Sequence, residues 1–350
     1  MLRRENMRSA FIRSLAVLSL LAPFPAEAQS ASGQGTAQQG GDFSSNLHPT
    51  EQQKVPAGVI IVKGAWSSAS DSVTPLPEGW SLTNNVFNDT YFGITYTVPL
   101  NWAANHNAPP PSDAGFYKLA FIRPTPAFKG IHGSIAIFAQ DMFFTQLPAS
   151  NAQELVNYKK HNLQADYKME LQPSATTIGG RVFSFYAYWS PVAGLHWYVL
   201  ATQIRCHAIE IVLTSRDTKL LESLVLELNN KMKLPAEANP TTGTGGGDFP
   251  VCIKDYARDN AIERVEPVFT ERRFNAVPVR IIIDKQGKIK HIHFLSAFPE
   301  QAKAVNDALA QWKFRPYLRD GKPVEVETGI MFGRASPSLA PETAASSPKD

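Results

Sequence analysis

The sequence is poor in charge and has no long apolar run. It has 34 Lys and Arg against 31 Asp and Glu, a net charge of +3 over 350 residues. A nucleic-acid-binding face needs a dense basic patch to displace counterions from phosphates, so we predict no nucleic acid partner. The apolar run Leu15–Phe24 is half of the roughly 20 residues that span a bilayer. We therefore expect a soluble chain without a permanent membrane anchor.

Common catalytic motifs are also missing. There is no G-x-S-x-G elbow, H-E-x-x-H helix, C-x-x-C pair or Walker loop. His291 and His293 lie two apart, and as a pair on one strand face they could chelate a metal, but a site needs a third ligand. We interpret them as a surface pair. The sequence predicts no catalytic residue, no metal and no cofactor, and hence a protein that is not an enzyme.

The first residues have the pattern of an export signal. Arginines precede the apolar run, and Ala26-Glu27-Ala28 fits a signal-peptidase site. We predict a signal peptide over residues 1–28, cleaved after Ala28, and a periplasmic or secreted mature protein. Residues 29–54 are rich in Gln, Ser and Gly, which predicts a disordered tail.

Only Cys206 and Cys252 are present. An even count in an oxidising compartment suggests a disulfide, although two free thiols are the alternative, since geometry cannot be read from spacing. A bond would clamp together two modules. These modules, residues 55–235 and 249–334, are separated by a Gly-rich linker over 236–248, and an Ala, Ser and Pro tail covers 335–350.

The first module is predicted to contain a mostly antiparallel sheet with two helices. Helices are expected from Ser150 to Asn162 and from Thr218 to Met232, the second with a stripe of leucines. The alternating segments are Tyr91–Val98, Phe116–Ile122, Ser134–Gln140, Arg181–Tyr188, Trp197–Arg205 and Ala208–Thr214. The aromatic residues Trp102, Tyr186, Tyr188 and Trp197 either line a ligand groove or, as we prefer, fill the core.

This module resembles the PsbP-like family in its segments NDTYFGITYTVPLNW (residues 88–102) and IGGRV (178–182) and in its closing amphipathic helix. The resemblance implies an α/β/α sandwich that serves as an accessory or binding domain. The resemblance therefore predicts the fold of this module but says little about any chemistry that it carries out.

The second module reads strand, strand, helix, strand. Two apolar runs flank Asp284–Gly287, where Gly can take the positive φ of a hairpin loop. The spacing of the second run indicates a bulge near Lys290. A helix is predicted after Pro299, and Val324–Phe332 is the last strand. The whole chain is thus predicted to be α+β, with a small ββαβ C-terminal domain.

This module closely resembles the TonB C-terminal domain family over about residues 265–334. The resemblance lies in IDKQGKI (283–289), ALAQWKFRP (308–316) and DGKPVEV (320–326). It implies a strand-accepting module that binds a segment of an envelope or outer-membrane protein. Val324, Val326, Thr328 and Ile330 would share one face of the partner-binding edge strand. Such an edge also favours a homodimer formed by strand pairing.

Three functions stay open beside strand addition: a TonB-type accessory in transport across the outer membrane, a small-ligand carrier using the aromatic groove, and an envelope hydrolase. An energy transducer of the TonB type would need a membrane anchor and a long rod. The linker reaches about 35 Å at most.

Overall fold

The computed structural model describes residues 60–62, 65–104, 112, 114–127, 130–236, 249–270 and 275–333. The predicted signal peptide, both predicted tails and residues 237–248 of the predicted linker lie outside these ranges. All described residues belong to one compact unit, residues 43–350. Within it, one large hydrophobic core is built from residues 87–232 with Leu295, and a second from residues 256–332.

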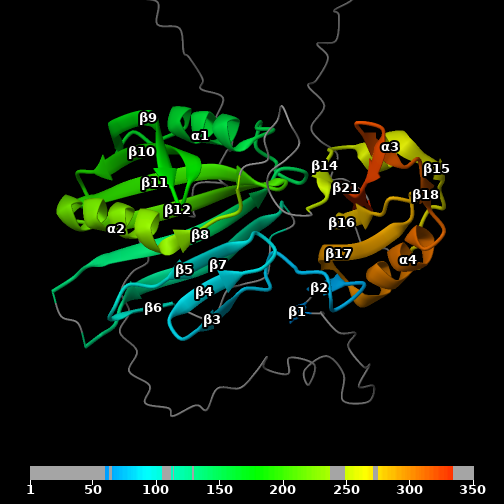
Figure 1. The fold of residues 1–350 in the computed structure, drawn as a ribbon, viewed down its shortest axis with the longest axis horizontal. Coiled ribbons are helices and arrows are strands. Elements are labelled where there is room, and N and C mark those ends of the chain that lie inside the picture. The colour runs from blue at the N-terminus through cyan, green and yellow to red at the C-terminus, as the bar shows by residue number, and fades with distance from the viewer. Residues whose placement is uncertain are drawn as a thin grey trace, which may run out of the picture. The chain divides into compact units, whose positions relative to one another are not determined.

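The N-terminal domain is built on a seven-stranded antiparallel sheet (Figure 1). Its strand order is β6-β7-β8-β12-β11-β10-β9, and neighbours in this order run antiparallel. The strands are β6 Trp102–Ala104, β7 Phe116–Pro124, β8 Gly133–Asp141, β9 Lys168–Ile178, β10 Arg181–Ser190, β11 Leu195–Ile204 and β12 His207–Ser215. Strand β9 is not among the predicted segments, because this edge strand is largely exposed and its sequence lacks an apolar alternation.

Both faces of this sheet are covered. Successive side chains of a strand point to opposite faces, and along β11 Val199 and Ala201 join one cluster while Leu200 joins another. Helix α1 (Ala152–His161) packs on the Val199 side through Val156. Helix α2 (Thr218–Lys231) packs on the Leu200 side, with its predicted stripe of Leu221, Leu224 and Leu228 buried.

A second, four-stranded sheet shares the α2 side. Its order is β13-β5-β4-β3, from Met232–Lys233, Ile94–Thr97, Val86–Asp89 and Ser81–Thr83. Phe87, Ile94 and Tyr96 of this sheet lie in the same core as the leucines of α2. The segment Tyr91–Val98, predicted for the main sheet, therefore belongs to this smaller layer.

The C-terminal domain has the predicted ββαβ order. Its central strands are β16 (Val277–Ile283), β17 (Ile289–Ala297) and β21 (Val326–Phe332), and α4 (Pro299–Leu309) covers one face. The hairpin register skips Lys290, since Ile282 pairs with His291 and Ile283 with Ile289. Smaller elements are α3 Tyr256–Asn260, β15 Ala261–Glu263, β18 Lys313–Phe314, β19 Tyr317–Arg319 and β20 Lys322–Val324.

Strands from elsewhere in the chain extend this sheet at both edges. The full order is β1-β2-β17-β16-β21-β14, with β1 Ile60–Val62, β2 Ala65–Ala69 and β14 Val251–Cys252. The segments that form β1 and β2 were predicted in the first module, but β2 pairs with β17 of the second sheet and β1 pairs with β2. Backbone pairing follows the edge that is available, which sequence position does not reveal.

The prediction of a free edge at the last strand is wrong over its first residues. Strand β14 pairs in parallel with Val326 and Glu327, so β21 has a neighbour on each side there. Val326 also faces the domain core and is buried, Thr328 is buried, and Ile330 packs against the same core. Val324 belongs to β20, which pairs with β19. These four residues do not form one exposed face.

Candidate functional site

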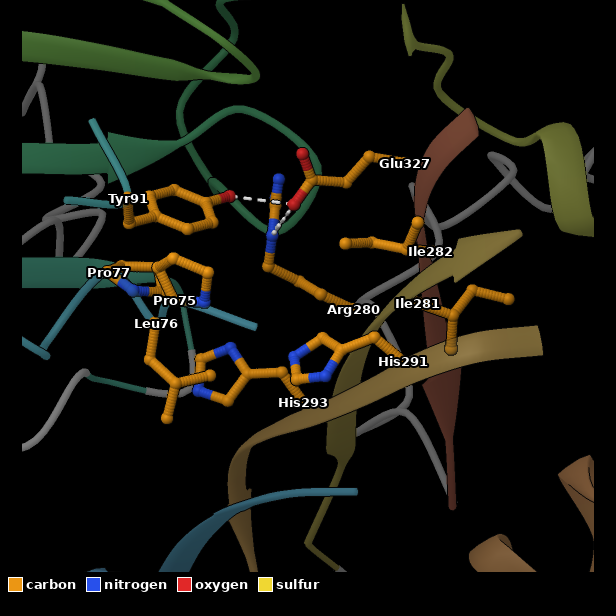
Figure 2. Close-up of a pocket in the computed structure, with 10 residues that line it drawn as sticks. All are labelled: Pro75, Leu76, Pro77, Tyr91, Arg280, Ile281, Ile282, His291, His293 and Glu327. Atoms are coloured by element: carbon orange, nitrogen blue, oxygen red, sulfur yellow. Dashed lines mark hydrogen bonds and ion pairs between the residues drawn. The ribbon is translucent and has the colours of Figure 1, made fainter. Parts of the chain in front are cut away.

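The face of the C-terminal sheet opposite α4 carries charged side chains that meet the N-terminal domain. Arg280 comes from β16, His291 and His293 come from β17, and Glu327 comes from β21 (Figure 2). All four are buried. Buried charges need partners, and the N-terminal domain supplies them.

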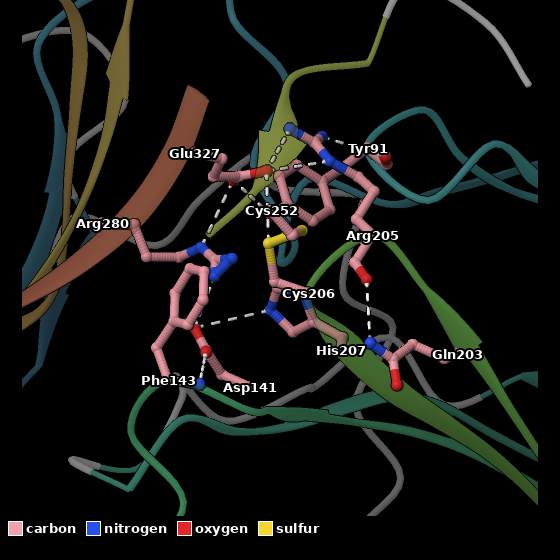
Figure 3. The surroundings of a disulfide bond; sticks show 10 residues. All are labelled: Tyr91, Asp141, Phe143, Gln203, Arg205, Cys206, His207, Cys252, Arg280 and Glu327. Atoms are coloured by element: carbon pink, nitrogen blue, oxygen red, sulfur yellow. Dashed lines mark hydrogen bonds and ion pairs between the residues drawn. A yellow bond between two sulfur atoms is a disulfide. The ribbon is translucent and has the colours of Figure 1, made fainter. Parts of the chain in front are cut away.

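Two carboxylates and two guanidinium groups form the centre of this cluster. Arg280 Nη1 donates to Asp141 Oδ2 at 2.9 Å, and its Nε lies 3.4 Å from Glu327 Oε1. Arg205 Nη2 donates to Glu327 Oε2 at 2.7 Å, and Tyr91 Oη donates to Oε1 at 2.7 Å. Figure 3 shows Glu327 between the two arginines. The four formal charges cancel, so the cluster is neutral while it is intact.

The backbone geometry around the cluster depends on a close approach at Gly329. A Cβ at this position would lie 2.8 Å from Phe143 Cβ and 2.9 Å from Phe144 Cζ. The guanidinium carbon of Arg280 lies over the Phe143 ring, 4.8 Å from the ring centroid. The Phe143 N–H donates to Asp141 Oδ1 at 2.8 Å. Glycine thus lets the β8 end of the N-terminal domain reach the sheet.

Burial and pairing shift the pKa of each acid in the cluster. Burial raises the pKa of Asp141 to about 6, although Arg280 opposes the change. Burial also acts on Glu327, but Arg280, Arg205 and the Tyr91 hydroxyl outweigh it and lower its pKa. Of the two acids, Glu327 therefore stays ionised to the lower pH.

A histidine beside this cluster has no hydrogen bond to any residue that the structure describes. His207 is fully buried among the rings of Tyr91, Phe92 and Tyr117, and its Nε2 lies 3.7 Å from Asp141 Oδ2. Burial and the nearby arginines lower its pKa well below the usual value. It is therefore a neutral packing group at physiological pH.

The histidine pair of β17 is buried, which corrects its interpretation as a surface pair. His291 Nδ1 lies 2.8 Å from Asp71 Oδ2, and His293 Nε2 lies 2.8 Å from Glu78 Oε1. Burial lowers the pKa of His291. Burial raises that of Asp71, but the Thr74 N–H and His291 bring it down to about 2. Each histidine thus fixes one end of the segment that follows β2.

The cavity at this cluster is too small for a substrate. Its volume is about 10 Å³, and Pro75, Leu76, Tyr91, Arg280 and the two histidines of β17 contribute to its walls. A single water molecule needs about that volume. The cluster joins the two domains through ion pairs and hydrogen bonds, and among the described residues Arg280 Nε and Nη2 have no hydrogen-bond partner.

The two cysteines are joined, as Figure 3 shows. Cys206 follows β11 at the tight turn before β12, and Cys252 lies in β14, so the bond connects the N-terminal domain to the strand beside β21. The two sulfurs and a Glu327 carboxylate oxygen lie within 4.8 Å of one another, a spacing that could suit a metal ion. Arg205 and Arg280 both face that carboxylate, however, and would repel a cation.

The predicted aromatic groove is not assembled. Trp102 packs in the core on the α2 side, whereas Tyr186, Tyr188 and Trp197 pack on the α1 side of the main sheet. All four are buried, and the rings of Tyr188 and Trp197 stack with centroids 5.3 Å apart. They fill the core, because ring faces at strand spacing pack best against a covering helix.

Sequence reasoning missed Asp141, Arg205, Arg280 and Glu327 as a group, because they come from four different strands and turns. One signal was available. Every residue of β16 except Arg280 is apolar, and all seven residues of the strand are buried. An unbroken apolar run indicates a strand covered on both faces, so a charge within it needed a buried partner.

Asp89, close to this cluster, gives a prediction for pH. Burial raises its pKa to about 7, although the N–H groups of Phe92 and Tyr91 oppose the change. Between about pH 4 and 7 the folded state holds a proton that the unfolded state has lost, so the stability from this group is fully present below about pH 4 and is lost progressively as pH rises to about 7. Asp89→Asn should raise the free energy of unfolding by up to about 4 kcal/mol at pH 8 and by less than half of that at pH 5. Urea unfolding at both values tests this, and a loss of stability at pH 8 would contradict it.

Comparison with known proteins identifies one of the two domains. Residues 271–333 match the family model described as Gram-negative bacterial TonB protein C-terminal. The C-terminal domain is a TonB-type domain. Strands β2 and β14, which extend its sheet, lie outside the matched residues.

Among solved structures, the chain is similar to cyanobacterial PsbP (CyanoP) from Synechocystis sp. PCC 6803, determined in solution. The identity is 16%, the TM-score is 0.30, and the match covers 43% of this chain and 91% of that one. No curated protein matches the chain. Within the described residues, no helix combines the length and the apolar character needed to cross a membrane.

Proposed function

We propose that this is an exported, non-enzymatic binding protein of the Gram-negative cell envelope. In this proposal its TonB-type domain takes up an extended segment of an envelope or outer-membrane protein as an added strand at β17. The observation that carries the proposal is the pairing of β2 with β17, in which a segment from outside the TonB-type domain already lies on that edge. A sheet edge offers backbone N–H and C=O groups in a fixed register, so it accepts any extended chain whose side chains fit.

The β17 edge is the more exchangeable of the two. Strand β2 pairs with it at Ala69–His293, Ser68–Phe294 and Trp66–Ala297, and the register is interrupted between the last two. Beyond β2, the N–H of Ser70 donates to Ile292 O at 2.7 Å. Strand β2 contains no cysteine, whereas β14 at the other edge contains Cys252 of the disulfide. A partner segment would replace β2 and keep the sheet intact.

A peptide experiment tests whether the β17 edge accepts a strand. The probe is a synthetic peptide with the sequence of residues 60–69, and it is titrated against the mature chain and against a chain that begins at Ser70. The shortened chain should bind the peptide at least ten times more tightly, because in the intact chain the same strand competes intramolecularly at an effective concentration in the millimolar range.

The matched control is the same peptide with proline at the position of Ser68, which removes a backbone donor and should abolish binding. Equal, weak binding of both peptides by a folded shortened chain would contradict the proposal. Capture of an outer-membrane transporter from envelope extracts by the shortened chain, and less by the intact chain, would specify the transport-accessory role.

A further inference from the structure

The β21 edge is covered at its first residues, Val326 and Glu327, by the chain's own strand β14. Val251 N–H donates to Glu325 O at 2.8 Å and Ile253 N–H to Glu327 O at 3.1 Å, so β14 follows β21 in parallel. Strand β14 has only two residues. Immediately after it, Tyr256 and Ala257 of α3 are buried in the core of the TonB-type domain.

A two-residue strand makes few non-covalent contacts that could keep it on the sheet. The non-covalent contacts of residues 249–253 include these two backbone hydrogen bonds, the packing of Ile253 against the C-terminal core, and the ring of Phe249, whose centroid is 5.2 Å from the guanidinium carbon of Arg205. Val251, Cys252 and Ile253 are only partly buried. The strongest restraint on β14 is the disulfide bond from Cys252 to Cys206, and Cys206 is buried.

We infer that the Cys206–Cys252 bond is a reducible latch that keeps β14 on the β21 edge. Reduction would release residues 249–253 while α3 stays packed, and it would expose the backbone groups of Glu325 and Glu327. The latch would regulate the proposed strand acceptor, because its opening would offer a second sheet edge to an extended partner segment. This role of the latch rests on the proposed function.

The chemistry is thiol–disulfide exchange with an external dithiol. A thiolate of the dithiol attacks the Sγ of Cys252, the less buried of the two cysteine residues, and the Cys206–Cys252 bond breaks with Cys206 as the leaving thiolate. The second thiol of the dithiol then displaces Cys252. The dithiol becomes a disulfide, and its two electrons and two protons end on Cys206 and Cys252.

The surroundings suit a thiol at position 206. Cys206 Sγ lies 4.0 Å from Glu327 Oε2, so the reduced S–H has a carboxylate acceptor in place. Glu327 keeps its partners Arg205, Arg280 and Tyr91, none of which depends on the disulfide. The charged cluster can therefore hold the two domains together after the latch opens.

Amide hydrogen exchange of the full mature chain tests the latch without any partner. The protein is compared with and without a dithiol reductant, with free thiols counted by mass. In the reduced protein, the amides of Val251 and Ile253 should exchange at least ten times faster, whereas the β16 amides stay protected in both states over one hour. A Cys206→Ser, Cys252→Ser chain should show the fast pattern with or without reductant.

Two results would overturn the inference. Unchanged protection of Val251 and Ile253 with both thiols free would mean that non-covalent contacts alone hold β14. If the β16 amides also lost their protection from exchange within one hour, the disulfide would stabilise the whole fold and not β14 alone. Neither result depends on the peptide experiment at β17, so failure of the latch and failure of the strand acceptor are distinguishable.

Discussion

Replacing Arg280 by methionine is expected to lower the free energy of unfolding by about 3–5 kcal/mol at pH 8, the usual cost of removing one partner of a buried ion pair. Arg280 is 2% exposed and lies between Asp141 and Glu327. Methionine has a similar length but no charge. The substitution would leave Asp141 buried without Arg280, its only guanidinium partner among the described residues, whereas Glu327 would keep Arg205 and Tyr91.

The same substitution should be better tolerated at low pH. The pKa of Asp141 is already raised to about 6 by burial, and Arg280 is the strongest influence that lowers it. Without Arg280 this pKa rises further, so Asp141 is neutral at pH 5 and its burial costs less. A carboxyl with a raised folded-state pKa loses stability progressively as pH rises from its unfolded pKa to its folded pKa. In the wild type this decline ends near pH 6, whereas in the variant it continues to higher pH, so the loss caused by the substitution should grow between pH 5 and 8.

Denaturant unfolding of the two proteins at pH 5 and pH 8 measures both effects. The matched control is the double variant Asp141→Asn, Arg280→Met, which removes the unpaired charge and should recover a large part of the lost stability at pH 8. A loss below about 1 kcal/mol for the single variant, or the same loss at both pH values, would show that the cluster does not carry this energy.

The second large effect concerns the disulfide. A Cys206→Ser, Cys252→Ser chain should be less stable than the wild type by up to about 4 kcal/mol, because the bond closes a loop with a sequence separation of 46 and limits the unfolded chain. Both serines fit the volume of the thiols, so packing around Cys206 changes little.

Unfolding by denaturant, with and without reductant, isolates this contribution. Reductant should move the midpoint of the wild type to that of the serine chain and leave the serine chain unaffected. If the serine chain matched the oxidised wild type, the unfolded state would gain no freedom from loss of the bond, and the loop-closure argument would fail here.

Local patterns predicted much of each domain. The leucine stripe of α2, the hairpin turn before Gly287 and the irregularity at Lys290 are all present in the structure. Each of these features depends on neighbours within a few residues, and turn chemistry and apolar period report such neighbours directly. The start of α1 was misplaced by one residue, since Asn151 rather than Ser150 caps it.

What the sequence could not supply is the contact between distant segments. The histidines of β17 looked like surface residues because their acidic partners, Asp71 and Glu78, lie more than 200 residues earlier. Strand β21 looked like an edge because β14 is two residues long and carries no strand pattern. Such pairings are decided by which surfaces meet once both domains have formed, and no local periodicity encodes that choice.

The disulfide also changes the topology of the chain. Cys206 and Cys252 close a covalent ring that includes β12, helix α2 and β14. The backbone passes from one domain to the other within that ring, so each domain is tied to its neighbour by two covalent routes. A protease that cuts once inside the ring would convert the chain into two polypeptides that remain a single molecule, and the protein could be nicked between its domains without losing either one.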